Sequence, residues 1–156
     1  MSARVGIGYD SHRLAEGETL VLGGVEIEHS KGLAGHSDAD VLTHAIIDAL
    51  LGSCGLGDLG QHFPPTDERY RDADSIELLR VVVGMLPGPA SNVDATLICE
   101  EPKLAPHRGE MEARLGEVLS APVSVKATTN EGMGSIGRGE GIACIAVAMV
   151  ETGDRA

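Results

Sequence analysis

One carboxylate and two imidazoles in this sequence are spaced so that they could bind a single metal ion. Asp10 and His12 follow the apolar run of residues 5–9, and His44 comes later in the chain. Alternate side chains of an extended strand share a face, so Asp10 and His12 would point the same way from the end of a strand. Three protein ligands leave a fourth position of a divalent ion open to water or substrate. The alternative is that these are ordinary polar residues leaving a strand.

His44 lies in a segment, residues 38–51, whose apolar positions recur at helical spacing. A strand end and a helix could therefore converge on one ion. Asp48 follows His44 by one helical turn on the same face. It could accept the free N–H of a metal-bound imidazole, or it could be a solvated acid on the outer face of the helix.

Three polar clusters accompany these ligands. Residues 35–40 (GHSDAD) predict a helix N-cap at Ser37 or Asp38, and such a helix start can also bind an anion. Residues 57–67 contain Asp58, which could bind sugar hydroxyls, although the composition is also typical of a turn. Residues 126–141 combine hydroxyls, glycines and an arginine, which favours a phosphate cradle over a plain glycine-rich connection.

The order of predicted elements indicates one α/β domain over residues 1–156. We expect an α+β sandwich in a ferredoxin-like arrangement, with helices on one face of a mixed sheet and an early β-hairpin. The strands are predicted at residues 4–9, 93–100, 123–129 and 139–151, with the hairpin at 20–27. The helices are predicted within 38–51, at 76–86 and at 107–119, and residues 57–71 are expected to form a long loop.

The formal charge of −12 argues against a nucleic-acid partner, which would be bound through clustered Lys and Arg. A small phosphorylated substrate stays compatible with this charge if metal ions supply the positive charge. The three cysteines are widely spaced and predict reduced thiols. The sequence shows neither a signal-like N-terminus nor an apolar run of membrane-spanning length, so we expect a cytoplasmic protein without membrane contact.

Several motifs in a fixed order resemble one family, the 2-C-methyl-D-erythritol 2,4-cyclodiphosphate synthases of the non-mevalonate isoprenoid pathway. The segments are GIGYDSHRL, GLAGHSDADVLTHAIIDALLG, GLGDLGQHFPPTD, EEPKLAPH and VKATTNEGMGSIGRGEGIAC. The resemblance implies a homotrimer with active sites between subunits. It also implies Zn²⁺ bound by Asp10, His12 and His44, and a second ion, Mg²⁺ or Mn²⁺, held with the help of Glu131.

The same resemblance assigns the remaining site residues. His36 and Thr129 match positions that stabilise the transition state. Residues matching substrate contacts are Asp10, His12, His36, Ser37, Asp58, Gly60, Lys103, Leu104, Ala105, Thr128, Thr129, Glu131 and Arg138. The implied reaction closes 4-diphosphocytidyl-2-C-methyl-D-erythritol 2-phosphate into the cyclic diphosphate and releases CMP.

Two positions depart from the family pattern. Ser135 stands where an aromatic residue commonly lines an apolar cavity of the trimer, and Pro65 stands where Asp is frequent. Two other functions also fit the ligand set: a zinc-dependent phosphohydrolase of a small phosphorylated metabolite, which would use the same three-ligand site, and a non-catalytic metal-binding trimer. The cyclising reaction needs no protein nucleophile, which agrees with the lack of an obvious triad.

Overall fold

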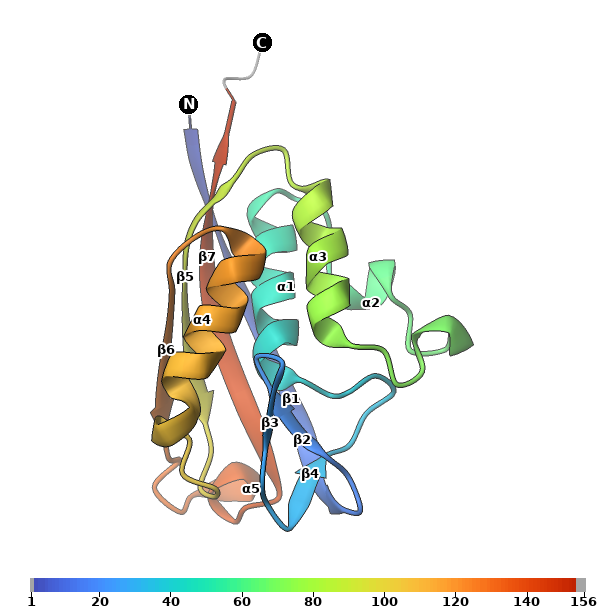
Figure 1. Ribbon diagram of the computed structural model, residues 1–156, viewed down its shortest axis with the longest axis vertical. Coiled ribbons are helices and arrows are strands. Elements are labelled where there is room, and N and C mark those ends of the chain that lie inside the picture. The colour runs from blue at the N-terminus through green and yellow to red at the C-terminus, as the bar shows by residue number, and fades with distance from the viewer. Residues whose placement is uncertain (1, 154–156) are drawn as a thin grey trace.

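The computed structural model describes residues 2–153, which form a sheet with helices packed against one face (Figure 1). The five strands of the sheet are β1 (Ser2–Glu16), β4 (Lys31–Leu33), β5 (Ala90–Ile98), β6 (Val123–Thr128) and β7 (Gly141–Thr152). The order is β4-β1-β7-β5-β6, with β5 and β6 parallel and the other pairs antiparallel. The predicted mixed sheet is confirmed.

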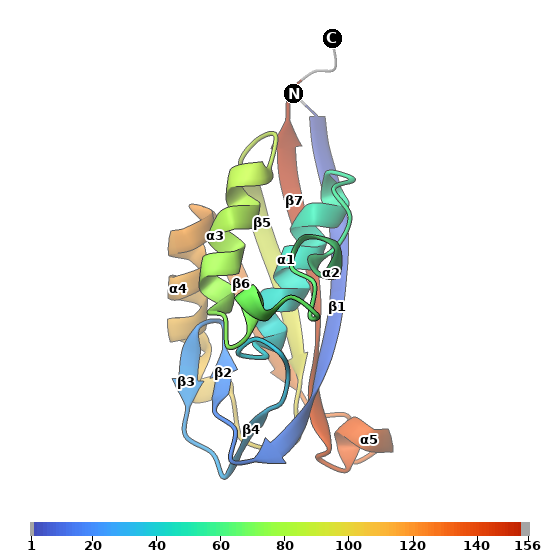
Figure 2. The same ribbon diagram turned by 90° about the vertical axis from the view of Figure 1, so that its right-hand side faces the viewer.

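Three helices cover the inner face of this sheet: α1 (Val41–Ser53), α3 (Ser75–Met85) and α4 (Arg108–Leu119). Figure 2 shows β1 and β7 along one side of the molecule and α3 and α4 along the other, and α1 packs between these strands and α3. Between the two layers lie the fully buried aliphatic side chains of the core, among them Ile46, Leu50 and Leu97. The predicted layering of helices on one face is therefore confirmed.

Strand β1 is much longer than the sequence predicted. It continues to Glu16 because β7 pairs with it as far as Arg13 and β4 pairs with residues 14–16. The motif Asp10-Ser11-His12 therefore lies within the strand and not at its end. Its alternation is as predicted: Asp10 and His12 are half-buried on the helix side, while Ser11 is exposed on the other side.

Two glycines of β1 let helix α1 lie directly on the strand. A Cβ added to Gly8 would come within 1.9 Å of the Ala45 carbonyl oxygen, and one on Gly6 within 1.9 Å of the Ala49 carbonyl oxygen. Any larger residue at either position would push the helix away. This close approach holds His44, the neighbour of Ala45 in α1, over the polar end of the buried face of β1.

The predicted hairpin is present as β2 (Leu20–Leu22) and β3 (Val25–Ile27), and a buried carboxylate fastens it to α1. Gly23 and Gly24 form the turn with φ of 60° and 71°, the left-handed values of a type I′ turn. Their N–H groups donate to Asp40 at 2.9 and 2.8 Å, and the N–H of Thr43 donates to the same side chain at 3.0 Å. Asp40 is thus the N-cap of α1, and the prediction of Ser37 or Asp38 was wrong.

Short elements were missed by the sequence analysis. Strand β4 has only three residues, too few for a recognisable alternation. The segment predicted as a long loop contains α2 (Leu59–His62) and the 3₁₀ turn η1 (Glu68–Tyr70). Another 3₁₀ turn, η2 (Ala105–His107), precedes α4, and α5 (Gly134–Gly137) lies within the predicted cradle. Each of these helical elements is a single turn, and capping and neighbouring residues fix its backbone more than any periodic pattern does.

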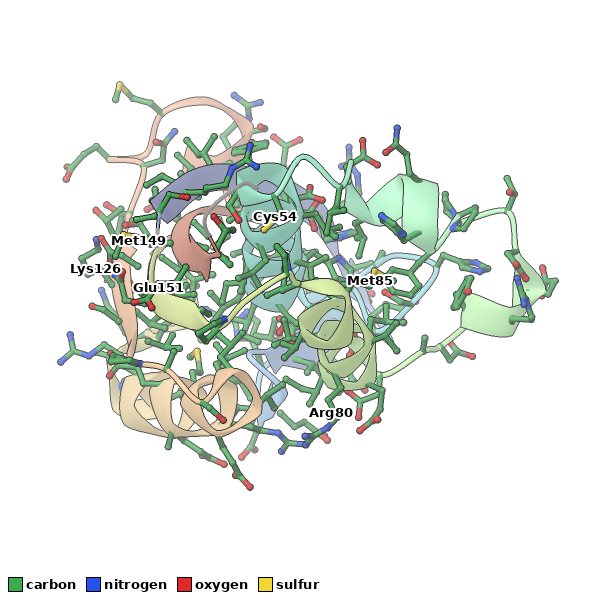
Figure 3. The ribbon with its side chains drawn as sticks, turned by 90° about the horizontal axis from the view of Figure 1, so that it is seen from above. Cys54, Arg80, Met85, Lys126, Met149 and Glu151 are labelled. Carbon is green, nitrogen blue, oxygen red and sulfur yellow. The ribbon has the colours of Figure 1, made fainter. Side chains whose placement is uncertain are left out.

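The outer face of the sheet carries exposed apolar side chains. Val5, Ile7 and Tyr9 of β1 are 65%, 70% and 60% exposed, and they lie beside Val147 and Ile145 of β7. Figure 3 shows that Lys126 and Met149 also lie on the side of the sheet away from the helices. A contiguous apolar surface of this kind is typical of an interaction site. No helix within residues 2–153 combines the length and apolar character needed to cross a membrane.

Candidate metal centre

The three predicted ligands converge on one point. Nε2 of His12 lies 2.9 Å from Oδ2 of Asp10, and Nδ1 of His44 lies 3.1 Å from the same oxygen. The two imidazole nitrogens are 3.3 Å apart. Ligand atoms at the corners of a tetrahedron around Zn²⁺ would be separated by about 3.3 to 3.5 Å. The triangle is therefore close to the size that a tetrahedral divalent ion requires.

Each imidazole is held by a hydrogen bond at its other nitrogen. Nδ1 of His12 lies 3.1 Å from the Ala34 carbonyl oxygen. A carbonyl can only accept, so Nδ1 of His12 carries a proton, and Nε2 is the nitrogen that would bind a metal once it gives up the proton it donates to Asp10. Nε2 of His44 lies 2.8 Å from Oγ of Ser75, the first residue of α3. Such partners fix ring orientation in metal sites.

The charge state of the site favours a cation. Burial alone would raise the pKa of the Asp10 carboxyl, but hydrogen bonds from His12 and His44 outweigh it and lower this pKa to about 2. Burial would likewise lower the pKa of His12, and the hydrogen bond to Asp10 reverses this and raises it. Asp10 is therefore an anionic oxygen ligand at neutral pH. One carboxylate with two imidazoles is a donor set that suits zinc and leaves a fourth position free.

A pocket of about 200 Å³ opens onto the three ligands. Its wall includes His36 and Ser37 from the loop before α1, and Gly60 from α2. Nε2 of His36 donates to the Asp67 carbonyl oxygen at 2.9 Å, which ties the two sides of the pocket together. The other wall residues are apolar or aromatic: Leu59, Phe63, Pro65, Tyr70 and Leu78. The smaller, polar part of the pocket wall can thus bind polar groups, and the larger, apolar part can cover a carbon skeleton.

Two acids of this region accept backbone N–H groups of α2. Asp48 accepts the backbone N–H of Leu59 at 2.7 Å, so it anchors α2 and is not the partner of the His44 imidazole. Asp58 is exposed at the N-cap of α2, where it accepts the N–H of Gln61 at 3.0 Å. The predicted contact of Asp58 with a substrate hydroxyl stays a prediction.

A second pocket, of about 140 Å³, lies at the ends of β5 and β6. It brings together five predicted substrate contacts: Lys103, Leu104, Ala105, Thr128 and Thr129. The strand register places Ser11 opposite Ala143, Ala143 opposite Ile98, and Ile98 opposite Thr128. Ser11 and Thr128 are therefore three interstrand spacings apart, which amounts to about 14 Å. Within one chain the second pocket is therefore well separated from the metal centre.

The loop after β6 is held by a carboxylate from the segment after β5, which the sequence analysis missed. Glu100 accepts the backbone N–H of Asn130 at 2.7 Å and that of Gly132 at 3.4 Å. These N–H groups, expected to bind phosphate, are thus already engaged. Arg138 pairs with Glu140 at 2.6 Å and remains exposed. Glu131 lies outside the group formed by Asp10, His12 and His44, and its role as a ligand stays a prediction.

Comparison with known proteins identifies the family. The sequence model of the YgbB family matches residues 3–151, almost the whole chain. The chain belongs to the YgbB family. It is 55% identical over 158 residues to the 2-C-methyl-D-erythritol 2,4-cyclodiphosphate synthase of Salinibacter ruber, covering 96% of this chain and 99% of that relative.

Solved structures agree with the YgbB family assignment. A 2C-methyl-D-erythritol-2,4-cyclodiphosphate synthase in a CDP-bound form matches 95% of this chain and 100% of its own, with 34% identity and a TM-score of 0.87. The bifunctional IspDF from Campylobacter jejuni matches 98% of this chain with 36% identity and a TM-score of 0.92. This chain covers 43% of that longer protein.

Proposed function

We propose that this YgbB family member converts 4-diphosphocytidyl-2-C-methyl-D-erythritol 2-phosphate into 2-C-methyl-D-erythritol 2,4-cyclodiphosphate and CMP. The observation that carries the proposal is the convergence of Asp10, His12 and His44 in the polar part of the wall of a mainly apolar pocket. The choice of substrate follows from the relatives named as synthases, which are more than 50% identical to this chain. The protein would thus be a cyclising phosphorus-oxygen lyase of isoprenoid precursor synthesis.

The reaction is an internal displacement. An oxygen of the substrate 2-phosphate forms a bond to the β-phosphorus of the CDP group. The bond between that phosphorus and the oxygen bridging to the α-phosphorus breaks, and CMP leaves with the electron pair. Because the nucleophile is already an oxyanion of the substrate, the protein has to position and neutralise, and not to activate, the attacking group.

Residues of this chain would orient the substrate in the pocket. The His36 imidazole and the Ser37 hydroxyl face the space in front of the three ligands and would hold the phosphates. The apolar wall of Leu59 and Phe63 would cover the carbon skeleton, and Gly60 would leave room for its hydroxyls. Thr129, at the second pocket, would donate its hydroxyl to a phosphate oxygen during the displacement.

The metal at Asp10, His12 and His44 is proposed to be Zn²⁺. When bound, a divalent ion there would withdraw charge from the phosphate under attack. Glu131 is proposed to help hold a second ion, Mg²⁺ or Mn²⁺, at the diphosphate. An acidic chain can bind an anionic substrate in this way because the cations reverse the local charge.

We also propose that the protein acts in the cytoplasm as a homotrimer with active sites between subunits. The strand positions Ser11 and Thr128, beside the metal centre and the second pocket, are about 14 Å apart across the sheet, so a compact substrate would meet both sites only where two chains adjoin. The exposed apolar face formed by Val5, Ile7, Tyr9 and the β7 residues Ile145 and Val147 supplies a surface for such an association.

The test is incubation of the purified protein with the cytidyl substrate and a divalent metal in ¹⁸O-labelled water. We expect CMP by chromatography and a cyclic diphosphate without labelled oxygen by mass spectrometry. A linear product carrying solvent oxygen would instead identify a phosphohydrolase. No CMP from a protein that binds metal at His44 would indicate a non-catalytic trimer, and either outcome would refute the proposal.

A further inference from the structure

His44 presents Nδ1 to the metal centre, while its other nitrogen is buried against the start of α3. Nε2 lies 2.8 Å from Oγ of Ser75, a fully buried residue, and 3.3 Å from Oγ of Ser37. A metal binds only the imidazole nitrogen that carries no proton. For Nδ1 to be a ligand, the proton of the neutral ring must sit on Nε2. The partner of Nε2 must therefore accept a hydrogen bond and not donate one.

The surroundings of Ser75 determine the direction of its hydroxyl. Asp38 receives the backbone N–H of Asp40 on Oδ1 at 3.1 Å and the backbone N–H of Ser75 on Oδ2 at 2.9 Å. The Ser75 hydroxyl also lies in hydrogen-bond contact with Oδ1 of Asp38. A carboxylate only accepts, so this hydroxyl donates to Asp38 and turns its lone pairs toward His44. The chain of donors then runs from His44 Nε2–H to Ser75 and from Ser75 O–H to Asp38.

We propose that Ser75 and Asp38 are positioning residues that keep the His44 proton on Nε2 and its Nδ1 lone pair on the metal. Ser37 is the weaker alternative partner, since its oxygen is more distant from Nε2 and is also approached by the N–H of Ala39 at 3.3 Å. The inference rests on the proposed metal site at Asp10, His12 and His44, and does not depend on which substrate is used.

The first test measures zinc affinity of the full-length protein by competition with a chromophoric chelator. Ser75→Ala removes the hydroxyl but keeps the backbone N–H that donates to Asp38. We expect the Kd for zinc to rise about 10- to 100-fold, as for other outer partners of metal-bound histidines. Ser53→Ala is the matched control, because Ser53 is also buried on a helix, and its hydroxyl donates to the Leu50 carbonyl at 2.7 Å and otherwise contacts Cys54 Sγ at 3.4 Å. Its zinc Kd should stay within about 2-fold of wild type, within measurement scatter for a site with no contact to the ligands.

The second test asks whether the two residues act as one unit. An amide at position 38 can turn its NH₂ toward Ser75, which would make the serine hydroxyl donate to Nε2 and move the His44 proton to Nδ1. Asp38→Asn should therefore weaken zinc binding at least as much as Ser75→Ala. The double variant should be no weaker than Asp38→Asn alone, because groups in one hydrogen-bond chain are not additive. Additive losses, or a zinc Kd of Ser75→Ala within 2-fold of wild type, would overturn the proposal.

A third measurement needs no variant to fold. In zinc-loaded wild-type protein labelled with ¹⁵N-histidine, the Nε2 proton of His44 should be visible by NMR and exchange slowly with water, because it is buried and bonded. Rapid exchange of this proton would overturn the proposal. These readouts are separate from CMP release, so an inactive protein that still shows the zinc and proton results would refute the proposed function alone.

Discussion

Replacement of Gly8 by alanine tests whether close packing of α1 on β1 sets the geometry of the metal centre. The new Cβ would lie 1.9 Å from the Ala45 carbonyl oxygen and 2.8 Å from the Ala49 N, whereas real Cβ atoms essentially never come within 3.0 Å of another heavy atom. The helix must therefore retreat by at least 1.1 Å, the difference between 1.9 and 3.0 Å. The same shift would carry His44 away from Asp10, whose ligand atoms are only 3.1 Å apart.

We expect Gly8→Ala to destabilise the protein by about 3 kcal/mol, the upper end of overpacking costs, because rigid backbone and not a flexible side chain meets the new atom. This corresponds to a fall in Tm of about 6 to 12 °C for a chain of this size. The assay is thermal unfolding at fixed protein concentration, together with zinc titration. Gly52→Ala in the same helix is the control, since its Cβ would meet only the Ile7 carbonyl at 3.9 Å. A Gly8→Ala protein with unchanged Tm and zinc affinity would refute this reasoning.

Three more outcomes follow from the structure. Asp40→Ala should lower the free energy of unfolding in denaturant by about 3 to 5 kcal/mol, because the N–H groups of the hairpin and of α1 that donate to this buried carboxylate would lose their acceptor. Because the pKa of Asp10 is lowered from 3.8 to about 2, its ionised carboxylate stabilises the metal-free fold above pH 3.8. Acid unfolding should show that about 2 kcal/mol of the free energy of unfolding is lost as the pH falls toward 2, and that Asp10→Asn lacks this loss. A thiol reagent at pH 8 should modify Cys54 before the other two cysteines, as followed by mass spectrometry. The reason is that burial raises the pKa of Cys99 to about 11 and raises that of Cys144 further. Faster modification of Cys99 or Cys144 would contradict this.

The metal ligands could be predicted because their signal is local. Alternation within a strand puts Asp10 and His12 on one face whether the strand ends there or continues, so the pair was found although the length of β1 was misjudged. His44 was found because the apolar spacing around it is helical. The hairpin was found because two glycines between apolar runs, here Gly23 and Gly24, are typical of a two-residue hairpin turn.

The errors concern residues whose partners are distant in sequence. Ser37, Asp38 and Asp40 are all good capping residues, and only the distant hairpin N–H groups select Asp40. Asp48 has the spacing of a histidine partner, but the start of α2 takes its carboxylate. Ser75 approaches His44 because α3 packs beside α1, and no periodicity in the sequence relates the two positions.

The central claim is that Asp10, His12 and His44 together bind one catalytic divalent ion per chain. Native mass spectrometry of the purified protein, with metal content measured on the same sample, tests this most directly. We predict a trimer that carries one tightly held zinc per chain, and the loss of that zinc in His44→Ala while the trimer mass is kept. Zinc retained at the wild-type ratio in His44→Ala, or a metal-free wild-type protein that still releases CMP in the presence of a chelator, would contradict the claim.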